Sequence, residues 1–299
     1  MHRRLAILSL AATAALTAGC AASSTGDGGG GGSATTGSST PATGSTSAAP
    51  DCSPATLKTH TGGTLTVATD SPAFEPWFVD NKPANGKGFE SAVAFAVAKQ
   101  LGYTTDQVKW VHVPFTSVIA PTPKNFDFDI NEVSITPKRA KAVDFSTGYY
   151  DVAQAVVALK SNKYAKATSI AGLKGAKLGA QKGTTSLDAI TNTIKPGGSP
   201  REYPTNDLAV QALKNGSIDG LVVDLPTGLF VTAAELDNAK IVGQLPASGT
   251  PEQFGLVLDK GSSLTACVSK AVDALRADGT LAALQKKWLT TSAGAPELS

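Results

Sequence analysis

The chain has 299 residues, which is long enough for one or two domains with a substantial core. Charged residues make up 17% of it, below the ~25% of an average globular chain, and its formal net charge is +2. Arg3 and Arg4 fall in a segment interpreted below as a removable leader, so the mature chain would carry equal numbers of basic and acidic residues. This balance argues against electrostatic capture of a polyanion, and no nucleic-acid partner is expected.

The first 19 residues have the pattern of an export signal. Met1–Arg4 is short and basic, and Leu5–Leu16 is a mostly apolar run, too short to span a bilayer core of about 30 Å. Leu16–Cys20 resembles the lipobox of bacterial lipoproteins, which implies that Cys20 becomes the lipidated N-terminus of the mature protein. Signal cleavage without lipidation is the alternative. No later segment has the ~18 consecutive apolar residues of a membrane span.

Residues 20–63 are predicted to be a flexible linker. From Ala21 to Pro50, 29 of 30 residues are Ala, Gly, Ser, Thr or Pro, a composition that cannot bury a core. A flexible chain of this length reaches about 30 Å, so it would hold a folded domain off the membrane and let it turn. A disordered tail without a function is the alternative.

Two cysteines remain after Cys20 is assigned to the anchor. Cys52 and Cys267 lie at opposite ends of the remaining chain, and in an oxidising compartment we expect them to form a disulfide. The mature histidines, His60 and His112, show no spacing with these cysteines that is typical of a zinc site. No metal and no other cofactor is expected.

Beyond residue 63, short apolar runs alternate with helical periodicity, which predicts an α/β fold. Strands separated by helices imply right-handed crossovers and a mostly parallel sheet. Two units of this texture follow one another. The predicted elements are strands at 65–68, 108–113 and 126–130 with a helix at 89–101, then strands at 176–180 and 218–223 with helices at 184–193 and 207–215, and a last helix at 263–275.

Each unit has an apolar strand that contains an aspartate and is followed by polar residues. These runs are 125–130 in the first unit and 217–224 in the second. In open α/β sheets, ligands bind beyond the carboxyl ends of the strands. Two facing lobes would therefore aim both sets of polar residues at a common cleft.

Several short motifs occur in a distinctive order, namely Gly88-Phe89-Glu90, the run from Ser134 to Arg139, the run from Gln181 to Thr185, Val222-Val223-Asp224, and an ending at Lys287-Trp288. With these motifs the chain resembles the polar-amino-acid solute-binding proteins of ABC importers over about residues 63–289. The resemblance implies a two-lobed, periplasmic-binding-protein-like type II fold that closes like a hinge. Two crossover strands, near 152–156 and 250–254, would join lobe 1 (64–151 and 255–289) to lobe 2 (157–249).

The same resemblance implies a set of ligand-binding residues. Arg139 would hold the ligand carboxylate through two parallel charge-assisted bonds, because a guanidinium is a planar fork of donors. Asp224 would accept from the α-ammonium group. Thr136 has an alternative role as a helix cap. The full implied set is Asp70, Phe74, Phe115, Glu132, Ser134, Thr136, Arg139, Gln181, Thr184, Thr185 and Asp224.

Other members of this set have distinct implied roles. Gln181, Thr184 and Thr185 stand where a strand turns into a helix, so backbone N–H groups there would form a second carboxylate clamp. Ordinary helix capping is the alternative for the threonines. Phe74 and Phe115 would enclose the aliphatic part of the ligand, with packing in the core as the alternative.

Glu132 is a departure from the family pattern, which usually has a small residue at this position. Asp70, at a position that in the family reaches the distal polar group of the ligand, would share the wall of lobe 1 with Glu132. Two carboxylates in a closing cleft repel each other unless a cation lies between them, which favours a cationic amino acid over any other single class. Alternatively, Glu132 faces solvent or pairs with a lysine, and Asp70 accepts from an amide such as that of glutamine.

Taken together, these features predict an extracytoplasmic, membrane-anchored, monomeric lipoprotein that binds a free amino acid and delivers it to an ABC permease. No catalytic residues are assigned and no enzyme activity is expected. Two alternatives remain. One is a dehydratase on the same fold, in which Glu132 would act as a general acid or base, and the other is a sensor that presents ligand-dependent surfaces to a receptor.

Overall fold

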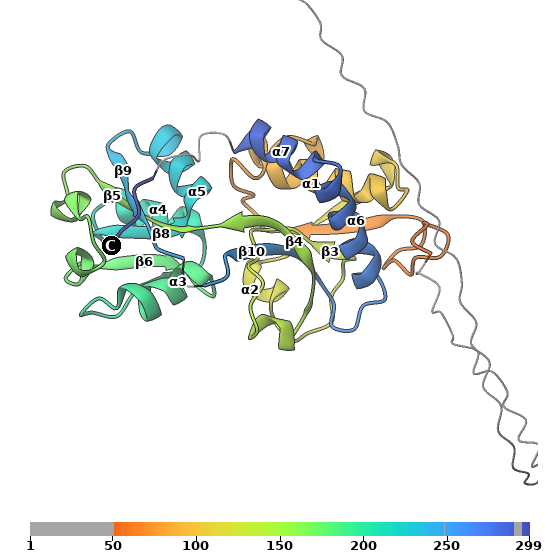
Figure 1. Ribbon diagram of the computed structural model, residues 1–299, viewed down its shortest axis with the longest axis horizontal. Helices are drawn as coiled ribbons and strands as arrows, with labels where there is room; N and C mark the ends of the chain where they lie inside the picture. The colour runs from red at the N-terminus through yellow and green to blue at the C-terminus, as the bar shows by residue number, and fades with distance from the viewer. Residues whose placement is uncertain (1–50, 248, 290–294) are drawn as a thin grey trace, which may run out of the picture. The chain divides into compact units, whose positions relative to one another are not determined.

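The computed structural model describes residues 51–247, 249–289 and 295–299, which belong to one compact unit (Figure 1). The predicted signal peptide, the lipidation site Cys20 and most of the predicted linker lie outside these residues. Among the described residues, no helix is both long enough and apolar enough to cross a membrane.

The first lobe is built on a five-stranded sheet with the order β2-β1-β3-β10-β4. β1 is parallel to β2 and β3, whereas β10 is antiparallel to β3 and β4. Helices α1, α6 and α7 contact one another beside this sheet (Figure 1). The bounds are β1 Leu65–Thr69, α1 Phe89–Gln100, β2 Val108–His112, α2 Phe115–Val118, β3 Phe128–Asp129, β4 Asp144–Val152, β10 Glu252–Leu258, α6 Thr265–Ala277 and α7 Thr280–Trp288.

The second lobe repeats this arrangement, with the strand order β7-β6-β8-β5-β9. β6 is parallel to β7 and β8, and β5 is antiparallel to β8 and β9. The helix predicted at 184–193 is observed as α3 followed by a π-helical segment. The bounds are β5 Gln154–Leu159, β6 Leu178–Gln181, α3 Thr185–Ala189, π-helix Ile190–Ile194, β7 Arg201–Tyr203, α4 Asn206–Lys214, β8 Gly220–Asp224, α5 Leu225–Phe230, π-helix Val231–Glu235 and β9 Ala239–Gln244.

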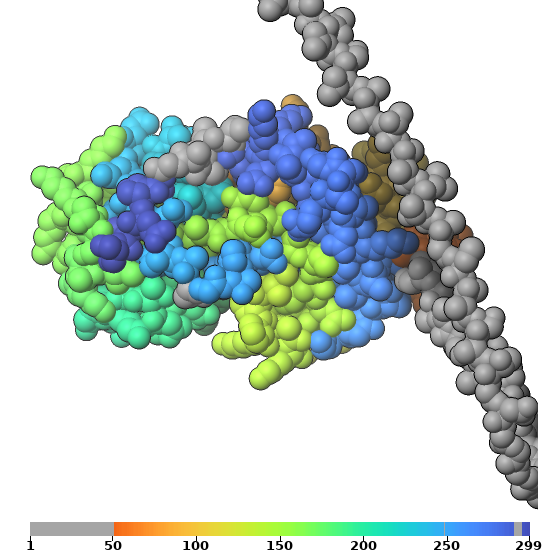
Figure 2. Space-filling model, in the orientation of Figure 1, coloured from red at the N-terminus to blue at the C-terminus, as the bar shows by residue number. Residues whose placement is uncertain are grey.

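The expectation of mostly parallel sheets is wrong. Each sheet has as many antiparallel as parallel pairings, because the chain crosses between the lobes through neighbouring strands that run in opposite directions. β4 ends in the first sheet at Val152 and β5 begins in the second at Gln154. β10 then returns and pairs along β4. In Figure 2 these segments, yellow-green and blue, lie side by side between the lobes.

Local chemistry explains the face and the end of α1. Phe89, Val93 and Val97 are fully buried on one face of α1, as their four-residue spacing predicts, and Gly102 follows the helix with φ 84°. β3 is shorter than the predicted strand at 126–130. Asp127, just before it, accepts hydrogen bonds from the N–H groups of His60 and Thr66 through its side chain, both at 2.6 Å.

Two further links hold the chain ends. A disulfide joins Cys52 to Cys267 in α6, with the Cα atoms 5.4 Å apart. At the other end, Leu298 is 1% exposed in the core of the second lobe, although Leu289 still packs in the core of the first. Glu297 forms a parallel bridge with Gln244 at the end of β9. The sequence contained no signal for this docked C-terminal segment.

Candidate functional site

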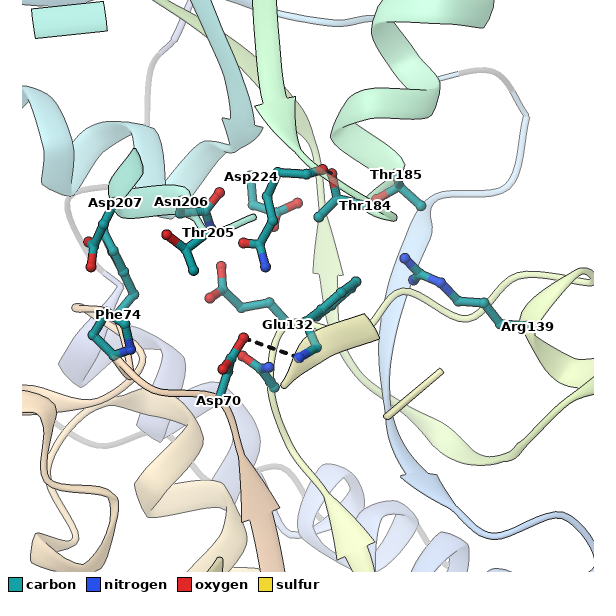
Figure 3. Close-up of a pocket in the computed structure, with 14 residues that line it drawn as sticks. Asp70, Phe74, Glu132, Arg139, Thr184, Thr185, Thr205, Asn206, Asp207 and Asp224 are labelled. Carbon is teal, nitrogen blue, oxygen red and sulfur yellow. Dashed lines mark hydrogen bonds between the residues drawn. The ribbon is translucent and has the colours of Figure 1, made fainter. Parts of the chain in front are cut away.

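A narrow cavity lies between the two lobes and is lined by residues of both. Asp70, Gln181 and Asp224 enter it from the carboxyl ends of β1, β6 and β8, where the strand-end rule places ligands. Figure 3 shows side chains of both lobes converging on it. The lining residues are Asp70, Pro72, Phe74, Phe115, Asn131, Glu132, Arg139, Gln181, Thr184, Thr185, Thr205, Asn206, Asp207 and Asp224.

Nine of the eleven residues expected to bind ligand line this cavity; Ser134 and Thr136 do not. The Ser134 hydroxyl is buried, donates to the Glu252 carboxylate and lies 3.1 Å from the Thr185 hydroxyl of the other lobe. Thr136 accepts the N–H of Arg139 at 3.1 Å, which is the capping role given above as its alternative. Both residues therefore contact the groups that surround the cavity.

Arg139 is the cation that lines the cavity, and it is held on three sides. Its Nη1 donates to the Ser134 carbonyl at 2.7 Å, and its Nη2 donates across the cleft to the Gly183 carbonyl at 2.9 Å. Its Cζ lies 5.4 Å from the ring centroid of Phe115. Burial lowers the pKa of Arg139, while Glu252 and other nearby carboxylates oppose that shift. The five N–H donors of a guanidinium leave donors available for a carboxylate in the cavity.

The second lobe contributes the start of α3. Thr184 is its N-cap, because the hydroxyl accepts the N–H of Leu187 at 3.2 Å and donates to the carbonyl of Gln181 at 2.7 Å. Gln181 and Thr185 flank this cap and line the cavity with it. Capping, the alternative role for the threonines, is observed for Thr184, and the second carboxylate clamp stays a prediction.

Asp224 ends β8 and lines the cavity from the second lobe, above Glu132 in the view of Figure 3. Its Oδ1 accepts a hydrogen bond from Gln154 Nε2 at 2.7 Å. Burial and the neighbouring carboxylate of Glu252 raise the pKa of Asp224 well above its usual value, and the Gln154 bond and Arg139 lower it in part. A cation beside Asp224 would stabilise its ionised form.

Glu132 points into the cavity and has an unusual backbone. Its φ of 53° is in the left-handed region, and its N–H donates to Oε1 of the fully buried Glu90 at 2.7 Å. Its own Oε2 accepts the hydroxyl proton of Thr227, in the other lobe, at 2.8 Å. Burial raises the pKa of Glu132, as do the charges of Asp224 and Glu90. Neither alternative for Glu132, solvent exposure or a lysine partner, describes this geometry.

Two backbone N–H groups hold the side-chain carboxylate of Asp70. Its Oδ1 accepts the N–H of Ser71 at 2.7 Å and its Oδ2 accepts that of Phe115 at 3.1 Å, while His112 Nε2 lies 3.9 Å from Oδ1. This places one carboxylate at the cavity wall opposite Asp224 and beside Glu132 (Figure 3).

The aromatic residues have different surroundings. Phe115 is buried against Arg139, as described above, and Phe74 packs edge-on against Phe230 of the other lobe, with ring centroids 6.4 Å apart. Trp77 belongs to the core of the first lobe, and its Nε1 donates to the hydroxyl of Thr227 at 2.8 Å.

Five lining residues were not predicted as ligand residues, namely Pro72, Asn131, Thr205, Asn206 and Asp207. Thr205 caps α4 through the N–H of Leu208 at 3.3 Å. The sequence signal for Thr205, Asn206 and Asp207 is that they are residue types typical of a helix start and lie at the beginning of the predicted helix at 207–215. The strand β7 before them was not predicted. Burial raises the pKa of Asp207.

The cavity as a whole combines one guanidinium with four carboxyl groups. The carboxyl groups belong to Asp70, Glu132, Asp207 and Asp224. Among the described residues, no group of three or more His, Cys, Asp or Glu side chains is arranged to hold a metal ion. The fold and this cavity define a two-lobed protein with a small-molecule site between its lobes.

Comparison with known proteins gives the family. The model for bacterial extracellular solute-binding proteins, family 3, matches residues 65–291, so the chain belongs to that family. It is 29% identical over 229 residues to the L-cystine-binding protein TcyJ of Escherichia coli K12, covering 76% of this chain and 82% of that protein.

Two solved structures extend this comparison. An ancestral arginine-binding protein, solved bound to glutamine, shares 32% identity and a TM-score of 0.65, covering 77% of this chain and 99% of that one. An ancestral amino acid-binding protein, a precursor of cyclohexadienyl dehydratase, shares 31% identity and a TM-score of 0.63, covering 76% of this chain and 95% of that one. The predicted family and the two-lobed type II fold are thereby confirmed.

Proposed function

We propose that this protein is the amino-acid-binding lipoprotein of an ABC importer and that its lobes close like a hinge on the ligand. The observation that carries the proposal is the placement of Arg139 on one lobe and Asp224 on the other, facing one cavity. A free amino acid has one carboxylate and one ammonium group, which these two side chains complement. The cystine-binding and arginine-binding relatives support an amino acid as the ligand.

The charge of the cavity favours a cationic amino acid. A zwitterionic ligand would neutralise the charges of Arg139 and of one carboxylate. Three further carboxyl groups that line the cavity would then have no cationic partner in the ligand. Burial already raises the pKa of Glu132 and of Asp224, so a neutral ligand would leave protons on this cluster. A ligand with a second positive charge would replace such a proton. The main alternative is a neutral polar ligand such as glutamine, the ligand bound to the ancestral arginine-binding relative.

A thermal-shift panel tests the ligand class. The panel comprises arginine, lysine, ornithine, histidine, glutamine and glutamate, and a ligand at 100 times its Kd should add about 2.7 kcal/mol of stability. We expect the cationic amino acids to stabilise the protein most. Stabilisation by glutamate without any cationic ligand would refute the class. The variant Glu132→Gln should shift the profile towards neutral ligands, and an unchanged profile would show that Glu132 does not select the ligand.

The proposal includes a lipid anchor at Cys20 and a tether that keeps the binding lobes near a permease at high effective concentration. The folded unit begins beyond the Ala-, Gly-, Ser- and Thr-rich segment, as such a tether requires. Membrane fractionation of cells that express Cys20→Ala tests the anchor. We expect this variant in the soluble extracytoplasmic fraction and the wild type in the membrane fraction, and the same distribution for both would refute lipidation. Native mass spectrometry of the purified protein would show whether it is a monomer.

A dehydratase is the alternative that one observation favours. Glu132 is a cavity-facing carboxyl with a raised pKa, which suits a general acid, and one solved relative is a dehydratase precursor. Mass analysis of a bound carboxylic acid after incubation would detect a product lighter by one water. The binding function predicts that the ligand is recovered unchanged.

A further inference from the structure

Thr227 connects the two lobes through two hydrogen bonds that involve no cavity ligand. It lies in α5 of the second lobe and is fully buried. Trp77, from the core of the first lobe, donates to its hydroxyl oxygen at 2.8 Å, and the Thr227 hydroxyl in turn lies 2.8 Å from Glu132 Oε2 of the first lobe. One side chain of lobe 2 is therefore held between two side chains of lobe 1.

The direction of both bonds follows from the chemistry of the groups. An indole nitrogen only donates, so the Thr227 oxygen is the acceptor of the Trp77 bond. The hydroxyl has one proton, which it donates to the Oε2 atom of Glu132. A buried polar group that loses its hydrogen-bond partner is destabilised. The chain of donors and acceptors is complete only when the lobes are together.

The backbone at Glu132 is arranged for this contact. A non-glycine residue with positive φ is disfavoured and persists only when its surroundings hold it. Here the carboxylate of Glu90 holds the Glu132 N–H at 2.7 Å, and the hydroxyl of Tyr149 donates to the same oxygen of Glu90. Both Glu90 and Tyr149 are buried in the first lobe. The core of lobe 1 thus fixes the turn that directs the Glu132 side chain towards lobe 2.

We propose that Trp77, Thr227 and Glu132 form a latch that holds the two lobes together in the absence of ligand. The proposal rests on the hinge closure included in the proposed function. Separation of the lobes breaks both bonds of Thr227 at once, since both partners belong to the other lobe. In this arrangement Glu132 is a positioning residue as well as a cavity residue, because one of its oxygens contacts the other lobe while its side chain lines the ligand cavity.

The latch has a measurable consequence for the ligand-free protein. Removing a hydrogen bond from a buried group shifts an equilibrium about tenfold. Thr227→Val keeps the shape of the side chain and removes the hydroxyl, so it should raise the open population relative to the closed one by about tenfold. The affinity for a ligand that binds the closed state should fall by up to the same factor.

Hydrogen exchange of the Trp77 indole N–H reports on the latch directly. Its nuclear magnetic resonance signal is identified by its loss in Trp77→Phe, and its exchange is measured in ligand-free protein. We expect the exchange to be about tenfold faster in Thr227→Val and near the wild-type rate in Thr227→Ser, which restores the hydroxyl. Thr232→Val is the matched control, because the Thr232 hydroxyl donates to the Leu229 carbonyl within the same lobe at 3.0 Å. Its exchange should match the wild type.

The outcomes separate the latch from the ligand assignment. Exchange in Thr227→Val within twofold of the wild type, when the thermal midpoint shows this variant to be folded, would overturn the latch. Equal acceleration by Thr232→Val would also overturn it, because the effect would then be general. Titration with L-arginine is measured on the same samples. Accelerated exchange in Thr227→Val without any arginine binding would support the latch and count against the proposed ligand class alone.

Discussion

Replacing Arg139 by alanine should abolish most ligand binding. The change removes the cationic side chain that lines the cavity, together with its hydrogen bonds to the carbonyls of Ser134 and Gly183 and its packing on Phe115. A ligand carboxylate would then be buried without a partner, which costs about 3–5 kcal/mol and corresponds to a loss of affinity of several hundredfold or more. Isothermal titration with the best ligand of the panel measures this loss.

The design must separate ligand contact from lobe closure, because one of the lost bonds crosses the cleft to Gly183. Arg139→Lys keeps the positive charge but not the planar fork, so it should recover part of the affinity and not all of it. The thermal midpoints of the ligand-free variants show whether the fold is retained. An Arg139→Ala variant that is folded and binds within threefold of the wild type would refute the assignment of Arg139 as the carboxylate-binding residue.

Three further predictions follow from burial, pairing and charge. Burial raises the pKa of Glu90 from 4.5 to about 7, so the folded state binds more protons, and the contribution of Glu90 to the free energy of unfolding should fall by about 3 kcal/mol as the pH rises through that interval. Glu90→Gln should flatten this slope in thermal unfolding, and an unaltered slope would contradict the assignment. Leu298→Ala should destabilise the protein by about 2 kcal/mol or more, because the Leu298 side chain is 1% exposed. The control Leu208→Ala, at a site that is 49% exposed, should have little effect. Equal effects of the two substitutions would show that the C-terminal segment is not docked. The Cys52–Cys267 bond should contribute up to about 4–5 kcal/mol, and two alkylatable thiols in unreduced, denatured protein that lacks Cys20 would contradict it.

The sequence located the cavity because its strand-end residues are local features. Asp224 follows an apolar strand and Gln181 precedes a helix start, and both face the cavity in the structure. Arg139 was found through a motif of the family that this chain retains. Each of these assignments depends on a short stretch of chain, so the position of the other lobe was not needed to make it.

Contacts between the lobes could not be predicted in the same way. Gln154 and Glu252 lie on the crossing strands and surround Asp224 only because β5 and β10 run past β8 and β4. Thr227 lies in a helix whose sequence is unremarkable, and its role depends on the approach of the first lobe. Such contacts require the three-dimensional arrangement of both sheets.

Unusual backbone conformation is a second feature that the sequence does not predict. The left-handed turn at Glu132 is held by Glu90, far away in the sequence, so no local preference indicates it. The side chain of Asp127, just before β3, accepts hydrogen bonds from the backbone of His60 and Thr66, which are about sixty residues away in the sequence. The antiparallel pairings in the two sheets likewise depend on the whole chain, because they are made by β10 and β5, which connect the lobes.

The central claim is that the cavity holds the carboxylate of an amino acid against Arg139 and a second positive charge against its carboxyl groups. Calorimetric titration of the wild-type protein with L-arginine, agmatine and L-citrulline tests both halves, because agmatine lacks the carboxylate and citrulline replaces the guanidinium by a neutral group of similar shape. We expect arginine to bind at least a hundredfold more tightly than either analogue, because a buried charge that loses its partner costs about 3 kcal/mol or more of binding free energy. Binding of agmatine or citrulline as tightly as arginine would contradict the account.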